Sequence, residues 1–171
     1  MKGLMGKTAI VTGGATMIGA AVVEVLRQAG VKVAVFDIDG AGAAEAVARD
    51  PVNTRSWELD ITDDRHVERG VAEVAAHFGS VDFLVNLACT YTDGGAGASR
   101  ADWLHALNVN LVSAVMMANA VRGEMCKAGA GAIVNFTSIS SRVAQTGRWL
   151  YPVSKAALLQ VTRSMAMDLA Q

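Results

Sequence analysis

The sequence is poor in the residue types that mark several classes of protein. Its two cysteines, Cys89 and Cys126, have no paired spacing and belong to no Cys/His cluster, which argues against a disulfide framework and gives no metal site. The net charge is −1, so no basic field invites nucleic acid. The uninterrupted apolar runs are well short of a membrane span, and the broken N-terminus is unlike a signal peptide. We therefore expect a cytoplasmic protein with no nucleic-acid or membrane partner.

Aromatic residues make up only 5% of the chain, whereas the hydrophobic fraction is 52% and glycine occurs 17 times. Alanine, valine and glycine carry much of this apolar content, which fits close packing of helices on a sheet. The 171 residues suffice for one domain with a real core.

Short apolar runs alternate with longer helical patterns along the whole chain. The predicted strands cover residues 8–11, 31–36, 54–59, 81–85 and 132–136. The predicted helices cover residues 18–29, 41–49, 63–78, 99–127 and 150–171. This alternation predicts an α/β fold, a Rossmann-like doubly wound parallel β-sheet with helices on both faces. We expect residues 1–171 to form one dinucleotide-binding and catalytic domain.

Polar or glycine residues follow each predicted strand. They are Gly13, Asp37, Asp60, Asn86 and Ser138. In a parallel sheet the carboxyl ends of the strands share one edge, and ligands bind beyond that edge. This placement predicts a ligand site there.

The segment 12–19 joins the first strand to the first helix through glycines, which let the backbone approach a pyrophosphate at a helix N-terminus. A plain glycine turn that binds nothing fits the same pattern. Asp37 closes the second strand, where a carboxylate can accept hydrogen bonds from both hydroxyls of an adenosine ribose and repel a 2′-phosphate. This favours NAD over NADP, although Asp37 could instead cap the next helix and Asp39 could share or take either task. Asp60 fits an adenine contact and a helix cap equally well.

Tyr151 and Lys155 lie four positions apart, so a helix presents both side chains on one face. A lysine ammonium beside a phenol favours the phenolate, which can exchange a proton with a substrate oxygen. Ser138 could donate a hydrogen bond to the same oxygen. Such a set suits carbonyl reduction or alcohol oxidation with a cofactor supplying or accepting hydride. By itself, however, the pair is also typical of a surface tyrosine and a solvated lysine.

Taken together, these motifs resemble those of the short-chain dehydrogenase/reductase family over the whole chain. The family's Thr-Gly-x-x-x-Gly-x-Gly resembles residues 12–19, and its Asn-Asn-Ala-Gly resembles residues 86–89. Its helix asparagine and its serine, tyrosine and lysine resemble Asn110, Ser138, Tyr151 and Lys155.

The resemblance implies a role for each catalytic residue. Tyr151 would be the general acid/base and Lys155 would bind the nicotinamide ribose and favour the Tyr151 phenolate. Ser138 would hold the substrate oxygen and Asn110 would keep a water of a proton relay. Asn110 could instead only satisfy helix backbone, and Thr137, Ser140 and Ser141 compete with Ser138. The predicted cofactor contacts are Gly13, Thr16, Met17, Ile18, Asp37, Ile38, Asp60, Ile61, Asn86, Ala88, Tyr151 and Lys155.

The predicted activity is NAD(P)-dependent interconversion of a secondary alcohol and a ketone, and the alternative is a catalytically silent dinucleotide-binding homologue. Tyr91 and Trp149 lie near the reacting end by topology.

Helices with apolar residues on more than one face indicate a partner surface, and the resemblance implies a homo-oligomer, a dimer or tetramer.

Three residues and the length depart from the family pattern. Met17 replaces a glycine, and Leu87 and Cys89 replace the second Asn and the Gly of Asn-Asn-Ala-Gly. Family members continue beyond the position of Gln171, so we expect the C-terminal strands to be lacking and the chain to be truncated.

Overall fold

A computed structural model describes residues 3–170 of the chain. The chain divides into two compact units, which are described separately. The first contains the residues up to Ala88 together with Met116–Val134, and the second contains Cys89–Val115 together with the residues from Asn135 onward. The single domain expected over residues 1–171 stays a prediction.

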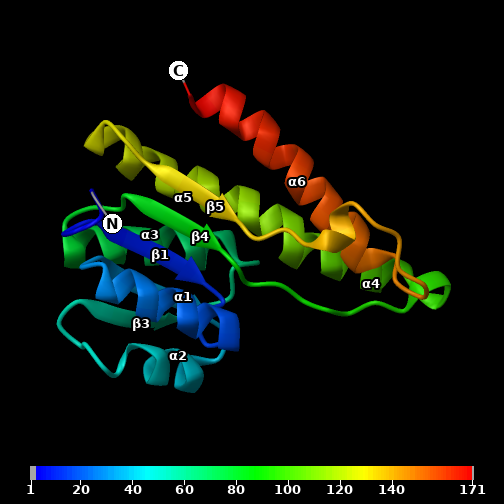
Figure 1. The fold of residues 1–171 in the computed structure, drawn as a ribbon, viewed down its shortest axis with the longest axis horizontal. Helices are drawn as coiled ribbons and strands as arrows, with labels where there is room; N and C mark the ends of the chain where they lie inside the picture. The colour runs from blue at the N-terminus through cyan, green and yellow to red at the C-terminus, as the bar shows by residue number, and fades with distance from the viewer. Residues whose placement is uncertain (1–2, 171) are drawn as a thin grey trace. The chain divides into compact units, whose positions relative to one another are not determined.

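The first unit is built on a five-stranded sheet (Figure 1). Its strand order is β3-β2-β1-β4-β5, and β1 pairs in parallel with β2 and β4 while β2 pairs in parallel with β3. All five residues of β1 are buried, as expected for a strand covered on both faces. The bounds are β1 Thr8–Thr12, β2 Lys32–Asp37, β3 Thr54–Glu58, β4 Phe83–Asn86 and β5 Ala132–Asn135. The predicted Rossmann-like parallel sheet is therefore confirmed.

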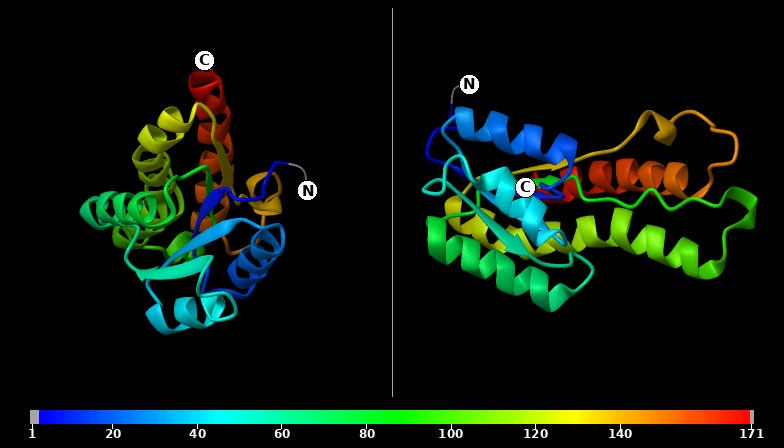
Figure 2. Two further views of the ribbon diagram at one scale, coloured as in Figure 1. Left: turned by 90° about the vertical axis from the view of Figure 1, so that its left-hand side faces the viewer. Right: turned by 90° about the horizontal axis from the view of Figure 1, so that it is seen from below.

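Helices cover both faces of this sheet. Two helices, α1 (Met17–Gln28) and α2 (Gly40–Val47), lie on one face, and α3 (Asp64–Phe78) lies on the other (Figure 2). Right-handed crossovers produce this division, because the chain steps outward from β1 to β3 and then returns to β4. The side chains of Ile10 and Phe36 are fully buried in the core between the layers.

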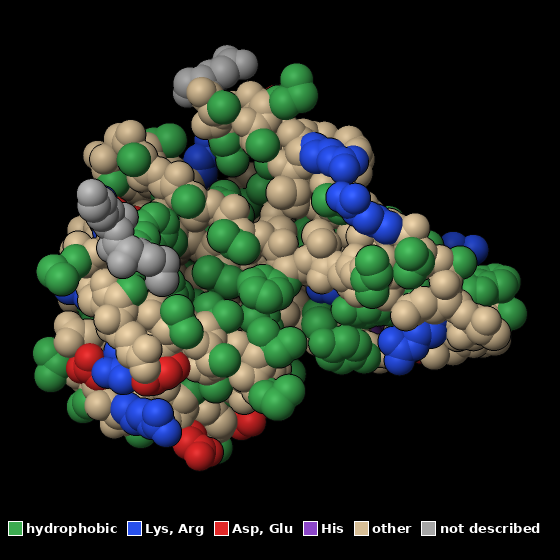
Figure 3. Space-filling model, in the orientation of Figure 1, with side chains coloured by type: hydrophobic (Ala, Val, Ile, Leu, Met, Phe, Trp, Pro, Cys, Tyr) green, Lys and Arg blue, Asp and Glu red, His purple; other side chains and the backbone are tan. Residues whose placement is uncertain are grey.

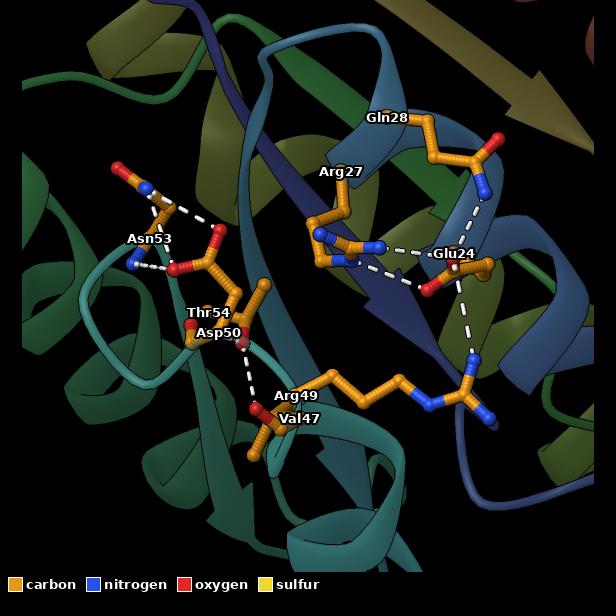
Figure 4. Close-up of polar contacts among 8 residues, drawn as sticks. All are labelled: Glu24, Arg27, Gln28, Val47, Arg49, Asp50, Asn53 and Thr54. Carbon is orange, nitrogen blue, oxygen red and sulfur yellow. Dashed lines mark hydrogen bonds and ion pairs between the residues drawn. The ribbon is translucent and has the colours of Figure 1, made fainter.

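A charged network on α1 ties two neighbouring βα units together. Glu24 accepts hydrogen bonds from Arg27 at 3.0 and 2.8 Å and from Gln28 at 2.7 Å (Figure 4). Arg49, in the segment between α2 and β3, lies 3.9 Å from the same carboxylate. The hydrogen bonds from Arg27 and Gln28 lower the pKa of Glu24 to about 2. Acidic and basic side chains gather over α1 and α2 on this face of the unit (Figure 3).

The helix predicted over residues 99–127 is not continuous. It consists of α4 (Arg100–Leu107), a π-helical turn over Asn108–Val112, and α5 (Ser113–Ala128). The N–H and the hydroxyl of Ser113 both reach the carbonyl of Asn108, the hydroxyl at 2.9 Å, and so close the wider turn. Apolar periodicity does not distinguish a π turn from an α turn, and such turns occur often at functional sites.

By length and composition alone, the helical stretch Arg100–Ala128 could cross a membrane, since it has 29 residues and a window of mean hydropathy 1.4. One such stretch is a weak indication, because the core helix of a globular protein passes the same test. Met117, Ala118 and Val121 are buried in the first unit, as such a core helix requires. The absence of a membrane partner stays a prediction.

The second unit is helical. It contains α4, the π turn, short 3₁₀ turns at Gly95–Gly97 and Ile139–Ser141, and the long helix α6 (Leu150–Leu169). The last of these carries Tyr151 and Lys155 and packs against α4, the π turn and the second 3₁₀ turn within the unit. The two units therefore carry different parts of the predicted site.

Candidate functional site

The glycine turn after β1 is closed by Thr16, the N-cap of α1. Its hydroxyl donates to the Gly13 carbonyl at 2.8 Å and accepts from the Gly19 N–H at 3.1 Å. The following N–H groups, on Met17 and Ile18, have no intrahelical acceptors because they belong to the first turn. A helix N-terminus of this form attracts an anionic group such as a pyrophosphate.

Close packing explains why glycine occupies position 13. Gly13 has φ +73°, and a Cβ there would lie 2.7 Å from the Cα and N of Ala88. The same turn needs Gly19, whose Cβ would collide with the carbonyl oxygen of Gly13. The turn and the segment after β4 are therefore in backbone contact.

A residue whose own role the sequence did not reveal, Thr12, fixes this contact. Its buried hydroxyl accepts from the N–H groups of Leu87 and Ala88 at 3.1 and 3.2 Å. Thr12 also pairs with Asn86 across β1 and β4, and Asn86 is buried. The structure thus brings the predicted residues Gly13, Asn86 and Ala88 together, although Leu87 and Cys89 depart from the family pattern.

Asp37 anchors the glycine turn and does not cap α2. One carboxylate oxygen accepts from the Ala15 N–H at 2.9 Å and the other from the Asp39 N–H at 3.0 Å. The cap of α2 is Asp39, which accepts from the Gly42 N–H at 3.0 Å. Sequence reasoning left these tasks open between the two aspartates, and the structure divides them.

The other predicted cofactor residues differ in accessibility. Asp60 closes its own turn by accepting from the N–H and hydroxyl of Thr62, both at 2.8 Å, while Asp63 caps α3, so the capping alternative for Asp60 is wrong. The Ile61 side chain is buried, whereas Ile38 and Met17 are exposed. The Met17 side chain is 87% exposed at the start of α1, so no other side chain covers it.

In the second unit, Tyr151 and Lys155 share one face of α6. Only 9% of Tyr151 and 3% of Lys155 are exposed, so the alternative of a surface tyrosine and a solvated lysine is wrong. The Lys155 Nζ lies 5.7 Å from the centroid of the Tyr151 ring and donates to the Phe136 carbonyl at 2.9 Å. Burial lowers the pKa of Lys155, and the charge of Cys89 acts in the opposite direction.

A second phenol stacks on Tyr151. The rings of Tyr91 and Tyr151 have centroids 5.2 Å apart and an interplanar angle of 28°. A side-chain hydrogen bond to Cys89, the charge of that thiol, burial and the charge of Tyr151 raise the pKa of Tyr91 to about 12. Because of this raised pKa the Tyr91 phenol stays neutral at neutral pH, whereas a tyrosine that acts as a general base must ionise.

Asn110 lies in the π turn, and its amide is occupied by protein groups. Its Oδ1 accepts from the Thr90 N–H at 2.7 Å, and its Nδ2 donates to the Thr90 carbonyl and the Ser154 hydroxyl, both at 3.0 Å. Ser154 in turn donates to the Tyr151 carbonyl at 2.8 Å. Asn110 thus fixes the 89–99 segment and α6 through its side chain, and its predicted role in a water relay stays a prediction.

Ser138 begins the 3₁₀ turn at Ile139–Ser141. It donates to the Ser140 hydroxyl at 3.1 Å and accepts from the Ser140 N–H at 3.2 Å. Ser140 is buried and donates to Gln145, while Ser141 donates to the Ser138 carbonyl at 2.6 Å. All three serines therefore make hydrogen bonds within the turn, and Ser138 stands half-buried at its start.

Asp93 is a further residue that the sequence did not single out. It reaches the first turn of α6 and accepts a hydrogen bond from the Tyr151 N–H at 3.0 Å. Among residues 3–170, no group of three or more His, Cys, Asp or Glu side chains is placed to hold a metal ion.

Comparison with known proteins relates this chain to dehydrogenases. The family model described as short chain dehydrogenase matches residues 7–171. The D-threitol dehydrogenase of Mycolicibacterium smegmatis is 35% identical over 96% of this chain, and the NAD-dependent glycerol dehydrogenase of Listeria innocua is 32% identical over 96% of it. The chain spans 65% of the length of each of these two relatives.

Solved structures agree with the sequence comparison. An NAD⁺-bound xylitol dehydrogenase superposes with a TM-score of 0.94 at 29% identity, covering 99% of this chain and 67% of that chain. A 7α-hydroxysteroid dehydrogenase complexed with NADH also gives 0.94, at 30% identity, covering 98% of this chain and 67% of that one. The resemblance predicted from the motifs is confirmed, and the chain belongs to the short-chain dehydrogenase family.

Proposed function

We propose that the protein containing this chain is an NAD-dependent oxidoreductase that interconverts a secondary alcohol and a ketone. The observation that carries the proposal is the burial of the Tyr151 phenol and the Lys155 amine on one face of α6, with the amine held by the Phe136 carbonyl. Burying a lysine ammonium costs free energy, so a buried lysine is a candidate functional residue. Beside a phenol, such a lysine can take part in acid/base chemistry.

In the oxidation direction, the Tyr151 phenolate takes the proton of the substrate hydroxyl as the C–H hydride leaves, and the alcohol carbon becomes a carbonyl. Bound NAD supplies the hydride acceptor. Lys155 stabilises the phenolate by its positive charge. The Ser138 hydroxyl turns away from its Ser140 acceptor and donates its hydrogen bond to the substrate oxygen instead. In the reduction direction Tyr151 returns the proton to the same oxygen.

The residues of the first unit fit a dinucleotide. The glycine turn offers the first N–H groups of α1 to a pyrophosphate, and the Asp37 carboxylate retains lone pairs for the hydroxyls of an adenosine ribose. Its negative charge repels a 2′-phosphate, which supports NAD over NADP. The names of the glycerol and xylitol dehydrogenases, one NAD-dependent and one NAD⁺-bound, support the same choice.

The cofactor preference is tested by Asp37→Ser, with NAD and NADP titrated separately against each protein. We expect the variant to lose affinity for NAD and to gain affinity for NADP. If the NAD/NADP ratio does not change, Asp37 only anchors the Ala15 N–H and the assigned preference fails.

The substrate class that the relatives support is a small polyol. Relatives of this chain are named for D-threitol, glycerol, galactitol and sorbitol. Thr90 and Thr92 flank Tyr91, whose ring stacks on Tyr151, and their hydroxyls lie 2.9 Å apart. We infer that the substrate is a secondary hydroxyl of such a polyol or the corresponding ketose.

We also infer that the protein is a cytoplasmic homo-oligomer, a dimer or a tetramer. Val153 and Met167 lie on one side of α6, 14 positions apart, and both are exposed, so a second copy would cover them. Both cysteines are free, which supports a reducing compartment. Sedimentation of the full-length protein tests the assembly, and a monomer at micromolar concentration would refute it.

The activity is tested by NADH absorbance with a panel of polyols and ketoses, using the full-length wild type and Tyr151→Phe. We expect turnover by the wild type, none by the variant, and the same NAD affinity in both. The alternative of a catalytically silent homologue predicts NAD binding without turnover in either protein.

A further inference from the structure

The N-terminus of α6 is capped by a side chain from a distant part of the second unit. One oxygen of Asp93 accepts from the N–H groups of Gly95 and Trp149, both at 3.0 Å, and the other accepts from the Tyr151 N–H at 3.0 Å. Asp93 and Tyr151 are 58 residues apart in the sequence. The carboxylate therefore bridges the 89–99 segment and the first turn of α6.

This helix needs an external cap. The first N–H groups of a helix have no intrahelical acceptors, and the N-cap residue of α6, Trp149, supplies no side-chain hydrogen bond. Burial of Asp93 favours its protonated form, but the hydrogen bonds from the N–H groups of Trp149, Tyr151 and Gly95 outweigh this and hold the pKa of Asp93 below its ordinary value. A carboxylate at a helix N-terminus is also favoured by the helix dipole.

The same segment is linked to Tyr151 at two further points, one directly and one through Asn110 and Ser154. Tyr91, two residues before Asp93, stacks on the Tyr151 ring. Thr90 is held by the Asn110 amide, which also binds Ser154, and Ser154 donates to the Tyr151 carbonyl. Backbone N–H, backbone carbonyl and ring of one residue are thus each fixed within this unit.

We propose that Asp93 is a positioning residue for Tyr151, holding the phenol in place through the first turn of α6. This inference rests on the proposed role of Tyr151 as general acid/base. Because proton transfer needs close alignment, a displacement of about 1 Å can lower a rate about 100-fold. The effect is expected in kcat, since the Asp93 carboxylate is occupied by backbone N–H groups.

The two oxygens of Asp93 make the test specific. Each accepts from an N–H group, so the amide nitrogen of an asparagine at this position must face an N–H donor in either orientation. Asp93→Asn therefore weakens the hydrogen bonds to the first turn of α6 without changing the volume of the side chain. A control for the loss of a carboxylate charge at a helix N-terminus is Asp63→Asn, because Asp63 caps α3 in the first unit by accepting from the N–H groups of Arg65 and His66 through one oxygen, which asparagine retains.

The experiment uses the full-length protein and measures kcat, KM, NAD affinity and amide hydrogen exchange for both variants. For Asp93→Asn we expect kcat to fall about 10- to 100-fold with unchanged KM and NAD affinity, and faster exchange at the Tyr151 amide. Asp63→Asn should keep the wild-type kcat. Wild-type kcat in Asp93→Asn, or an equal loss in both variants, would overturn the proposal.

A second readout works without turnover. A Tyr91→Phe background retains the stacked ring, and the difference in phenolate absorbance between Tyr91→Phe and Tyr91→Phe/Tyr151→Phe reports Tyr151 within the full-length protein. Adding Asp93→Asn should shift this titration curve, whereas an unchanged curve would overturn the positioning role. If the wild type shows no turnover but the curve shifts, the proposed activity fails and the positioning of Tyr151 by Asp93 stands.

Discussion

Replacing Gly13 by alanine should damage the glycine turn for two separable reasons. The backbone at Gly13 has φ +73°, a left-handed conformation that costs an L-residue about 1–2 kcal/mol. Alanine also lowers the conformational entropy of the unfolded chain relative to glycine, which offsets about 0.4–1 kcal/mol of this cost. The new Cβ would also lie 2.7 Å from the Cα and N of Ala88, and because these are backbone atoms no side-chain rotation relieves the contact.

The cost of the contact with Ala88 can be isolated by comparing Gly13→Ala with Gly79→Ala. Gly79 follows α3 in the same unit with φ +90°, and a Cβ there meets nothing within 4 Å. Gly79→Ala therefore reports the conformational cost alone. The overpacking at Gly13 should add about 1–3 kcal/mol to the loss in free energy of unfolding.

Urea unfolding at neutral pH and NAD titration of the two variants provide the assay. Gly13→Ala should be the less stable variant by that difference and should bind NAD more weakly than the wild type, because the turn must move away from Ala88. Gly79→Ala should bind NAD normally. Equal losses of stability in the two variants would refute the close-packing argument, and unchanged NAD affinity in Gly13→Ala would refute the role of the turn.

Two further predictions concern ionisable groups. In Tyr151→Phe, Tyr91 should titrate somewhat below its raised pKa of about 12, because the contribution from the Tyr151 charge is removed. Adding Cys89→Ala should lower the midpoint further because the hydrogen bond to Cys89 is the main cause of the shift, and an unchanged midpoint would contradict this contact. The difference in absorbance from Tyr91→Phe/Tyr151→Phe isolates Tyr91. Asp82→Asn should cost about 1.5–3 kcal/mol, since the buried carboxylate accepts a hydrogen bond from Lys7 at 2.7 Å. Burial raises the pKa of Asp82, but its hydrogen bonds outweigh burial and lower it below the ordinary value. The stabilisation is therefore present above the unfolded-state pKa and lost as pH falls through the folded-state value, so the difference from wild type in urea unfolding should shrink in acid, and a pH-independent difference would contradict the assignment.

Local patterns in the sequence were sufficient for the elements of the fold. The run Thr8–Val11 predicts a buried strand, and β1 at Thr8–Thr12 is buried throughout. The helix predicted over residues 63–78 is α3, with Asp63 as its N-cap. The break at Asn108–Val112 could not be predicted, because a π turn keeps the apolar pattern of the flanking helices and depends on an extra contact from Ser113.

The division of tasks between neighbouring polar residues also needed the structure. Asp37 and Asp39 are chemically identical and two positions apart, yet one binds the Ala15 N–H and the other caps α2. Which of them reaches the glycine turn depends on where β2 ends relative to β1. That register is set by strand pairing and is absent from the local sequence.

The sequence by itself determined the alternation of strands and helices, the glycine turn after β1 and the spacing of Tyr151 and Lys155, because each depends on residues close together in the chain. Only the tertiary structure decided that this pair is buried, that Thr12 binds a segment 75 residues away, and that Asp93 caps a helix whose Tyr151 lies 58 residues later. Burial and hydrogen bonds between distant segments follow from how the chain packs, and no local periodicity encodes them.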